Sequence, residues 1–148
     1  MRRRQNPATW VLAAVLAGTS AILLANPAAP ITVSEAWSRP TPPGAMGATY
    51  LLITNRGSQP DRLLSVSSPA ARQVEIDETR TVGGISRMRT HGALDVPAGG
   101  SVRLEPGALH IMLMDLPRPL AAGAHYALTL RFRDAGAITV DVPVRDQP

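Results

Sequence analysis

The sequence contains no cysteine among its 148 residues, and this excludes every function that needs a thiol. Thiol redox catalysis, thiolate zinc sites, blue-copper electron transfer and a lipid anchor on an N-terminal cysteine all depend on that residue. Without disulfides, the folded state has to be stabilised by its core. A single domain of about 115 residues can bury enough apolar surface to fold in this way.

Lysine is also absent, and all 15 basic residues are arginines. Three of them are Arg2, Arg3 and Arg4, so the rest of the chain has 12 arginines against 11 acidic residues. No block of like charge remains there, which argues against a nucleic-acid partner. No Ser-His-Asp arrangement, paired acid site or phosphate loop stands out either, so we do not expect an enzyme.

The first residues have the order of a secretory leader. A basic start is followed by an uncharged, mostly apolar run at 8–25 and by a small-residue stretch at 25–30. We therefore predict a signal peptide at 1–29, export to the periplasm and one folded domain at 31–146. The alternative is an uncleaved anchor, because 18 apolar residues just span a bilayer of roughly 30 Å. Any contact with a membrane would then run through this leader.

Beyond the leader, proline and glycine interrupt the sequence at short intervals, and the segments between them alternate between apolar and polar residues. The segments 101–105, 125–133 and 137–144 each place apolar side chains at every second position. This period of two is typical of strands with one face on a core. The spacing predicts an all-β sandwich or barrel, in which a hairpin at 134–136 joins the last two strands.

Residues whose side chains could bind a metal ion through sulfur or nitrogen are concentrated in the segment 108–114. If it is a strand, one face carries Leu109, Ile111 and Leu113, and the other carries His110, Met112 and Met114. Side chains two residues apart on a strand lie roughly 6.5 to 7 Å apart, so the histidine and the first methionine can reach one ion. We interpret Met114 as a residue that fills a gap in the core.

Two further candidates flank a predicted turn at Gly83 and Gly84. Asp77 lies in the strand before this turn, and Met88 lies in the strand after it. The turn predicts that 72–80 and 84–90 pair as a hairpin, which brings the two candidates near each other. The pattern by itself does not place either of them beside His110.

These residues resemble the periplasmic copper chaperones of the PCuAC type, whose signature of Cu(I) ligands is His-x10-Met-x21-His-x-Met. Met88, His110 and Met112 match its last three positions with the spacing intact, and Asp77 stands where the first histidine is expected. The resemblance extends over nearly all of Ile31 to Val144. It is carried by the segments 36–44, 50–55, 66–71, 87–89 and 107–114.

The aspartate leaves three arrangements open, because a carboxylate is a hard ligand that suits Cu(I) poorly. In the arrangement that we favour, Met88, His110 and Met112 hold Cu(I) without it. In the second, Asp77 joins them in a site that tolerates Cu(II). In the third, His91 replaces the missing nitrogen ligand.

The resemblance implies a Greek-key β-sandwich similar to cupredoxins, with an exposed copper site at its rim. The implied function is a carrier that binds Cu(I) and helps to load the copper centre of cytochrome c oxidase. Its partners would be an oxidase subunit or another assembly chaperone. The alternative is a diverged paralogue that has weakened or lost copper binding and acts as an extracytoplasmic interaction domain.

Overall fold

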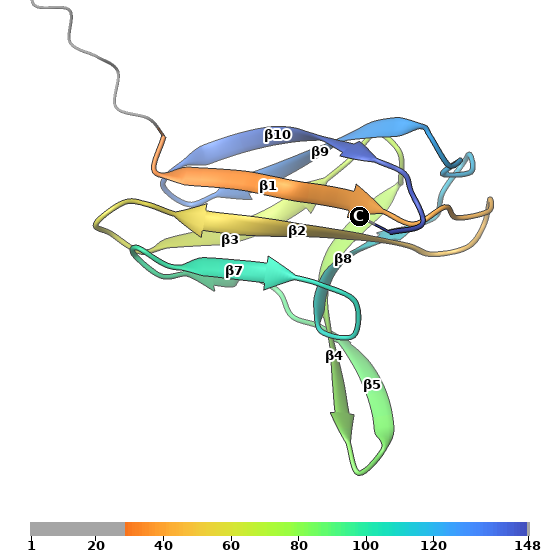
Figure 1. Cartoon of the computed structure of the whole chain (residues 1–148), viewed down its shortest axis with the longest axis horizontal. Helices are drawn as coiled ribbons and strands as arrows, with labels where there is room; N and C mark the ends of the chain where they lie inside the picture. The colour runs from red at the N-terminus through yellow and green to blue at the C-terminus, as the bar shows by residue number, and fades with distance from the viewer. Residues whose placement is uncertain (1–28, 148) are drawn as a thin grey trace, which may run out of the picture.

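The computed structural model describes residues 29–147, so nearly all of the predicted leader at 1–29 lies outside the described residues. The described residues form ten β-strands in two antiparallel sheets (Figure 1). Within this range, no helix is long and apolar enough to cross a membrane. The all-β prediction is therefore confirmed.

The first sheet contains six strands, and β8 and β4 lie at its centre. Its order is β1 (Ile31–Ser38), β2 (Gly47–Asn55), β8 (Leu109–Met114), β4 (Gln73–Val82) and β5 (Ile85–Thr90), and β7 (Ser101–Leu104) also pairs with β2. The second sheet has the order β10 (Gly136–Pro143), β9 (His125–Phe132), β3 (Asp61–Ser67) and β6 (Leu94–Val96). The chain changes sheet several times, as expected for a Greek-key sandwich.

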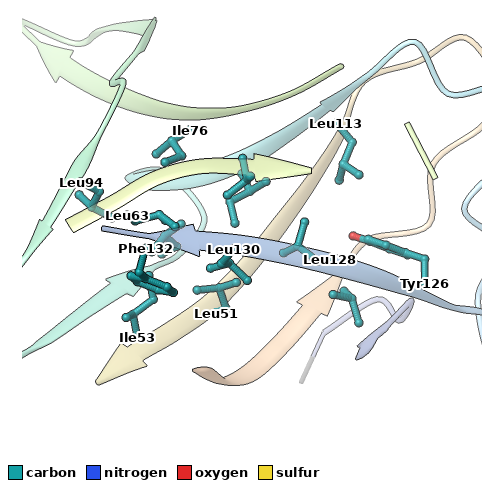
Figure 2. Close-up of a cluster of buried hydrophobic side chains, with 14 of the residues drawn as sticks. Leu51, Ile53, Leu63, Ile76, Leu94, Leu113, Tyr126, Leu128, Leu130 and Phe132 are labelled. Carbon is teal, nitrogen blue, oxygen red and sulfur yellow. The ribbon is translucent and has the colours of Figure 1, made fainter. Parts of the chain in front are cut away.

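The core lies between the two sheets and is built from the alternating positions that the sequence indicated (Figure 2). On β9, Leu128 and Leu130 are fully buried. Across the core, Leu51 and Ile53 on β2 and Ile111 on β8 are equally inaccessible. The predicted final hairpin is confirmed, because β9 and β10 pair along their whole length.

The hairpin of β4 and β5 extends away from the body of the sandwich (Figure 1). Val82 pairs with Ile85, so the loop between the strands consists of Gly83 and Gly84 alone. Both glycines have positive φ, 60° and 78°. A two-residue loop of this kind matches the right-handed twist of the strands and strongly favours glycine at both positions. The predicted pairing of 72–80 with 84–90 is therefore confirmed.

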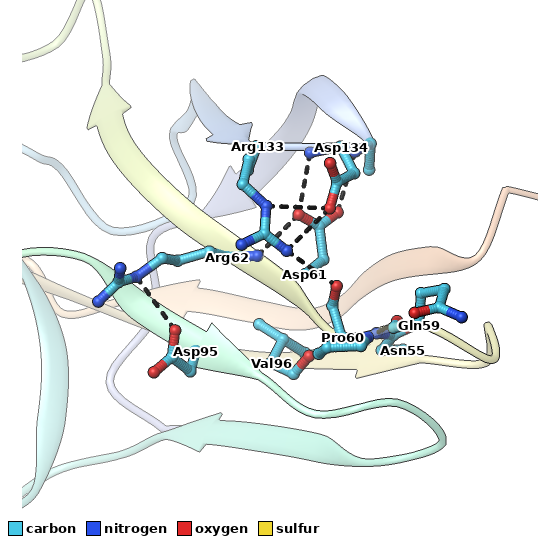
Figure 3. Close-up of polar contacts among 10 residues, drawn as sticks. Asn55, Gln59, Pro60, Asp61, Arg62, Asp95, Val96, Arg133 and Asp134 are labelled. Atoms are coloured by element: carbon cyan, nitrogen blue, oxygen red, sulfur yellow. Dashed lines mark hydrogen bonds and ion pairs between the residues drawn. The ribbon is translucent and has the colours of Figure 1, made fainter.

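A buried carboxylate connects the start of β3 to the turn between β9 and β10 (Figure 3). Asp61 accepts hydrogen bonds from the backbone N–H groups of Arg62 at 2.7 Å, Asp134 at 3.0 Å and Ala135 at 2.9 Å. Burial raises the pKa of Asp61, but these donors and the nearby charge of Arg133 outweigh it and hold the pKa below its ordinary value of 3.8. The ionised form therefore stabilises the fold above pH 3.8, and this contribution is lost as the pH falls through the lower, folded-state pKa.

Replacing the carboxylate by an amide tests this connection. We expect Asp61→Asn to lower the free energy of unfolding at pH 7 by about 2 kcal/mol, because an amide offers one acceptor oxygen and no charge to three donors. Urea denaturation at pH 7 and pH 3 checks this, with Asp95→Asn on the exposed β6 surface as the control. The difference between wild type and Asp61→Asn should narrow at pH 3. A difference that is equal at both pH values would contradict the proposed role of the charge.

Candidate metal site

The pairing of β4 with β8 brings the first and third positions of the predicted motif together. Asp77 lies directly opposite His110 in the antiparallel register, and on its other side it lies opposite Thr90 of β5. Directly opposed residues have Cβ atoms about 4.5 to 5.5 Å apart and project from the same face of the sheet. The structure therefore places the two residues side by side, which the hairpin pattern alone could not predict.

The two methionines lie on this same face. Met112 is two residues along β8 from His110 and lies opposite Ala48 of β2. Met88 on β5 lies opposite Thr79, so it is a diagonal neighbour of Asp77. Diagonal neighbours are about 7 to 8 Å apart, a distance that long side chains can bridge. All four motif positions thus share one face across β8, β4 and β5.

Burial divides these four residues into two groups. His110, Met112 and Asp77 are only 4%, 6% and 7% exposed, whereas Met88 is 54% exposed. The expectation of an exposed site is therefore wrong for the ligands on β8 and correct only for Met88 on β5. The reason is that β8 lies between β2 and β4 and has covered side chains on both of its faces.

Aromatic residues form a second, smaller apolar layer on the outer side of the first sheet. Trp37 on β1 and Tyr50 on β2 are each less than 9% exposed, and their ring centroids lie 4.8 Å apart. The guanidinium of Arg39 lies 5.9 Å from both centroids. Tyr50 is two residues along β2 from Ala48, which is the partner of Met112, so this layer borders the candidate site.

The His110 ring is oriented by a backbone carbonyl. Its Nδ1 lies 3.0 Å from the carbonyl oxygen of Ala108. When Nδ1–H donates this hydrogen bond, Nε2 carries the free lone pair and becomes the nitrogen available to a metal ion. A second contact of this kind is a common feature of histidines that bind metals.

Asp77, the register partner of His110, has an unsatisfied atom. Its Oδ1 is buried and has no hydrogen-bond partner in the described part of the chain. Burying a carboxylate oxygen without a partner costs free energy unless a cation or a donor compensates for it. Because Asp77 lies opposite His110 in the register, a cation bound by His110 could also compensate for this oxygen.

The remaining candidates are less well placed. His91 follows the end of β5, and its backbone N–H donates to the carbonyl of Ile76, which puts it level with a core residue rather than with Asp77. Its Nδ1 is also buried and has no hydrogen-bond partner among residues 29–147. Met114 ends β8 opposite Gln73 and is half-buried.

The sequence interpretation did not include Glu75, which lies opposite Met112 on the same face. Its two carboxylate oxygens accept hydrogen bonds from the Gln73 amide at 2.5 Å and from the Thr90 hydroxyl at 3.1 Å. Alternation with Asp77 was the signal that could have identified it. Across residues 29–147, no three histidine or acidic side chains converge as a metal site. The donor atoms carried by this face are the ring nitrogens of one histidine, carboxylate oxygens and two thioether sulfurs.

Solved structures with the same architecture define the class of fold. The copper-bound PCuAC domain from PmoF2 matches with a TM-score of 0.65 and 28% identity, over 80% of this chain and 94% of that domain. The Cu(I) form of DR1885 from Deinococcus radiodurans matches with a TM-score of 0.61 and 29% identity, over 87% of this chain and 85% of that protein. The predicted cupredoxin-like β fold is confirmed.

The chain belongs to the LpqE-like family, described as putative lipoprotein LpqE-like, which matches residues 31–144. It is 38% identical over 117 residues to the putative lipoprotein Lxx21020 of Leifsonia xyli, covering 78% of this chain and 70% of that protein. It is 29% identical over 120 residues to the uncharacterized protein RP573 of Rickettsia prowazekii, covering 77% of this chain and 66% of that protein. The present sequence has no cysteine to which a lipid could be attached.

The unsatisfied carboxylate leads to a prediction for the metal-free protein. We expect Asp77→Asn to raise the free energy of unfolding by about 1 kcal/mol, because an amide is less costly to bury than an unpaired carboxylate. Chemical denaturation at pH 7 in the presence of a chelator measures this. The exposed Asp141→Asn variant on β10 is the control and should stay within about 0.5 kcal/mol of wild type. A loss of stability in Asp77→Asn would show that the carboxylate is already satisfied.

Proposed function

We propose that this protein is a periplasmic metallochaperone that binds one Cu(I) ion through Met88, His110 and Met112. The observation that carries the proposal is the register that sets Asp77 against His110 on the face shared by both methionines. Copper-bound relatives of the same fold support the choice of metal. Copper is the cargo in this proposal, and we propose no catalytic reaction.

The donor set suits a monovalent soft ion. Two thioethers and one imidazole favour Cu(I) over hard cations such as Mg²⁺ or Ca²⁺. The thioethers need no deprotonation, so a proton competes with the metal only at the imidazole of His110. In this arrangement Asp77 contributes a negative charge beside the ion, which compensates for placing a cation among buried side chains.

The difference in exposure between the ligands on β8 and Met88 suggests how the ion enters and leaves. His110 and Met112 are buried on a central strand, whereas Met88 lies on the exposed edge strand of a projecting hairpin. In our proposal the ion reaches the two buried donors from the Met88 side, and Met88 completes the site last. Loss of the exposed thioether then starts transfer to an acceptor with stronger, thiolate ligands.

The acceptor that we propose is a protein of cytochrome c oxidase assembly, either the oxidase subunit that holds copper or another chaperone. The basic and apolar residues at the start of the chain support export to the compartment where such a transfer takes place. This step rests on the resemblance to PCuAC chaperones. The proposed copper site does not depend on it.

Removal of single ligands should weaken copper binding in a graded way. We expect His110→Ala to abolish measurable Cu(I) retention and Met88→Ala to weaken binding about tenfold, a loss of one ligand worth about 1.4 kcal/mol. Competition with a chromogenic Cu(I) chelator measures both affinities. The control is Met46→Ala, since Met46 is 65% exposed and lies outside the motif. Full binding by a Met88→Ala, His110→Ala double variant would reject the assigned site.

The role of Asp77 is tested by counting ligand atoms. X-ray absorption of the copper-loaded protein should show two sulfur neighbours and one nitrogen, and Asp77→His should add a nitrogen and tighten Cu(I) binding. If wild type retains no Cu(I) and only Asp77→His does, the chain is the diverged paralogue. An absence of sulfur neighbours would remove Met88 and Met112 from the site.

A further inference from the structure

The hairpin of β4 and β5 has a second face, which takes no part in the candidate metal site. Alternation puts Asp77 and Met88 on one side of the hairpin. The other side carries three cross-strand pairs, which are Val82 with Ile85, Arg80 with Arg87 and Glu78 with Arg89. We call the part of the hairpin from 78 to 89 the arm, and the side with these three pairs its basic face.

The end of the arm is apolar and exposed. Val82 is 76% exposed and Ile85 is 61% exposed, and the two form the last cross-strand pair before the glycine loop. This end of the hairpin projects beyond the sandwich (Figure 1). Together with Arg80, Arg87 and Arg89, Val82 and Ile85 line an open hollow of about 390 Å³. These two apolar side chains do not belong to the hydrophobic core, so their burial does not contribute to the stability of the fold.

The charge of the basic face is positive and only partly compensated. Arg80 and Arg89 both pair with Glu78, at 2.9 and 3.0 Å. Arg87 forms no ion pair with any residue in 29–147. Three guanidinium groups against one carboxylate leave this face with a net charge of +2.

We propose that the tip of the arm docks on an anionic phospholipid surface. The order of the side chains along the arm carries this proposal: the apolar pair Val82 and Ile85 comes first, the arginine pair one row behind it, and the row with Glu78 last. In a bilayer the acyl chains lie beneath the phosphates. A tip that enters the surface therefore places its leading apolar pair among the chains and its arginines at the level of the phosphates. Guanidinium groups bind phosphate oxygens in a bidentate manner. An acidic protein surface would match the charge, but it has no need of an apolar tip ahead of the arginines.

The geometry gives the docking a consequence for the site. Val82 is five positions along β4 from Asp77, a length of about 17 Å in a strand. A tip at the headgroup level therefore holds the face with Asp77 and His110 close above the membrane, where a membrane-bound acceptor is within reach. The docking itself uses none of the proposed copper ligands and requires no bound metal.

The absence of cysteine allows a single reporter to be placed in the full chain. Ser86→Cys carries an environment-sensitive fluorophore beside the tip and leaves both apolar residues intact. Ser101→Cys on β7 is the matched exposed control. With phosphatidylglycerol vesicles we expect a blue shift of the tip label alone, and with phosphatidylcholine vesicles no shift at either position. Binding through the apolar run at 8–25 would leave the tip label in water and so overturn the proposal.

Variants in the labelled background separate the two parts of the contact. Arg87→Gln should weaken binding to the anionic vesicles about fivefold, whereas the exposed Arg131→Gln on β9 should not change it. The Val82→Ser, Ile85→Ser double variant should abolish the blue shift, and its Cu(I) affinity should equal that of wild type. If the tip label responds to polyglutamate but not to the vesicles, the partner of the basic face is an acidic protein. This result would overturn the lipid assignment.

Discussion

The register of β4 against β8 is the constraint on which the rest of this structure depends. Ile76 and Ile111 are direct partners in that register, and both are buried in the core. Because successive side chains alternate between the faces of a sheet, burial of this pair forces Asp77 and His110 together on the opposite face. A slip of one residue would expose the isoleucine and separate the two polar residues. The hydrophobic core thus determines the geometry of the candidate metal site.

The position of β8 also explains why His110 and Met112 are more buried than residues on a solvent-exposed face of a sheet. A central strand can bury both faces when each is covered, and here the outer face adjoins the layer of Trp37 and Tyr50. Polar residues on such a face need partners. His110 has one in the Ala108 carbonyl, whereas one oxygen of Asp77 has none within the described part of the chain. At this position a bound cation would compensate for the buried oxygen of Asp77.

Local patterns in the sequence were sufficient for several of the strands and for two hairpins. Alternation indicated β9 and β10, and two glycines indicated the β4–β5 turn. Asp77 and His110, however, are 33 positions apart, and no local signal states which strands become neighbours across that distance. The resemblance to a family supplied the grouping of ligands. It did not supply the burial of His110 and Met112, because burial depends on which elements cover the outer face.

The arm shows how one hairpin can hold two kinds of chemistry. The period of two places Asp77, Thr79 and Met88 on one side and the arginine and apolar pairs on the other, so neither set interferes with its neighbour. All residues of β5 are exposed, and few contacts with the core constrain them. Substitutions on the basic face therefore leave the core register intact, and with it the approach of Asp77 to His110. A surface that recognises a partner can change on this arm without altering the metal ligands, because the two sides are coupled only through the backbone that they share.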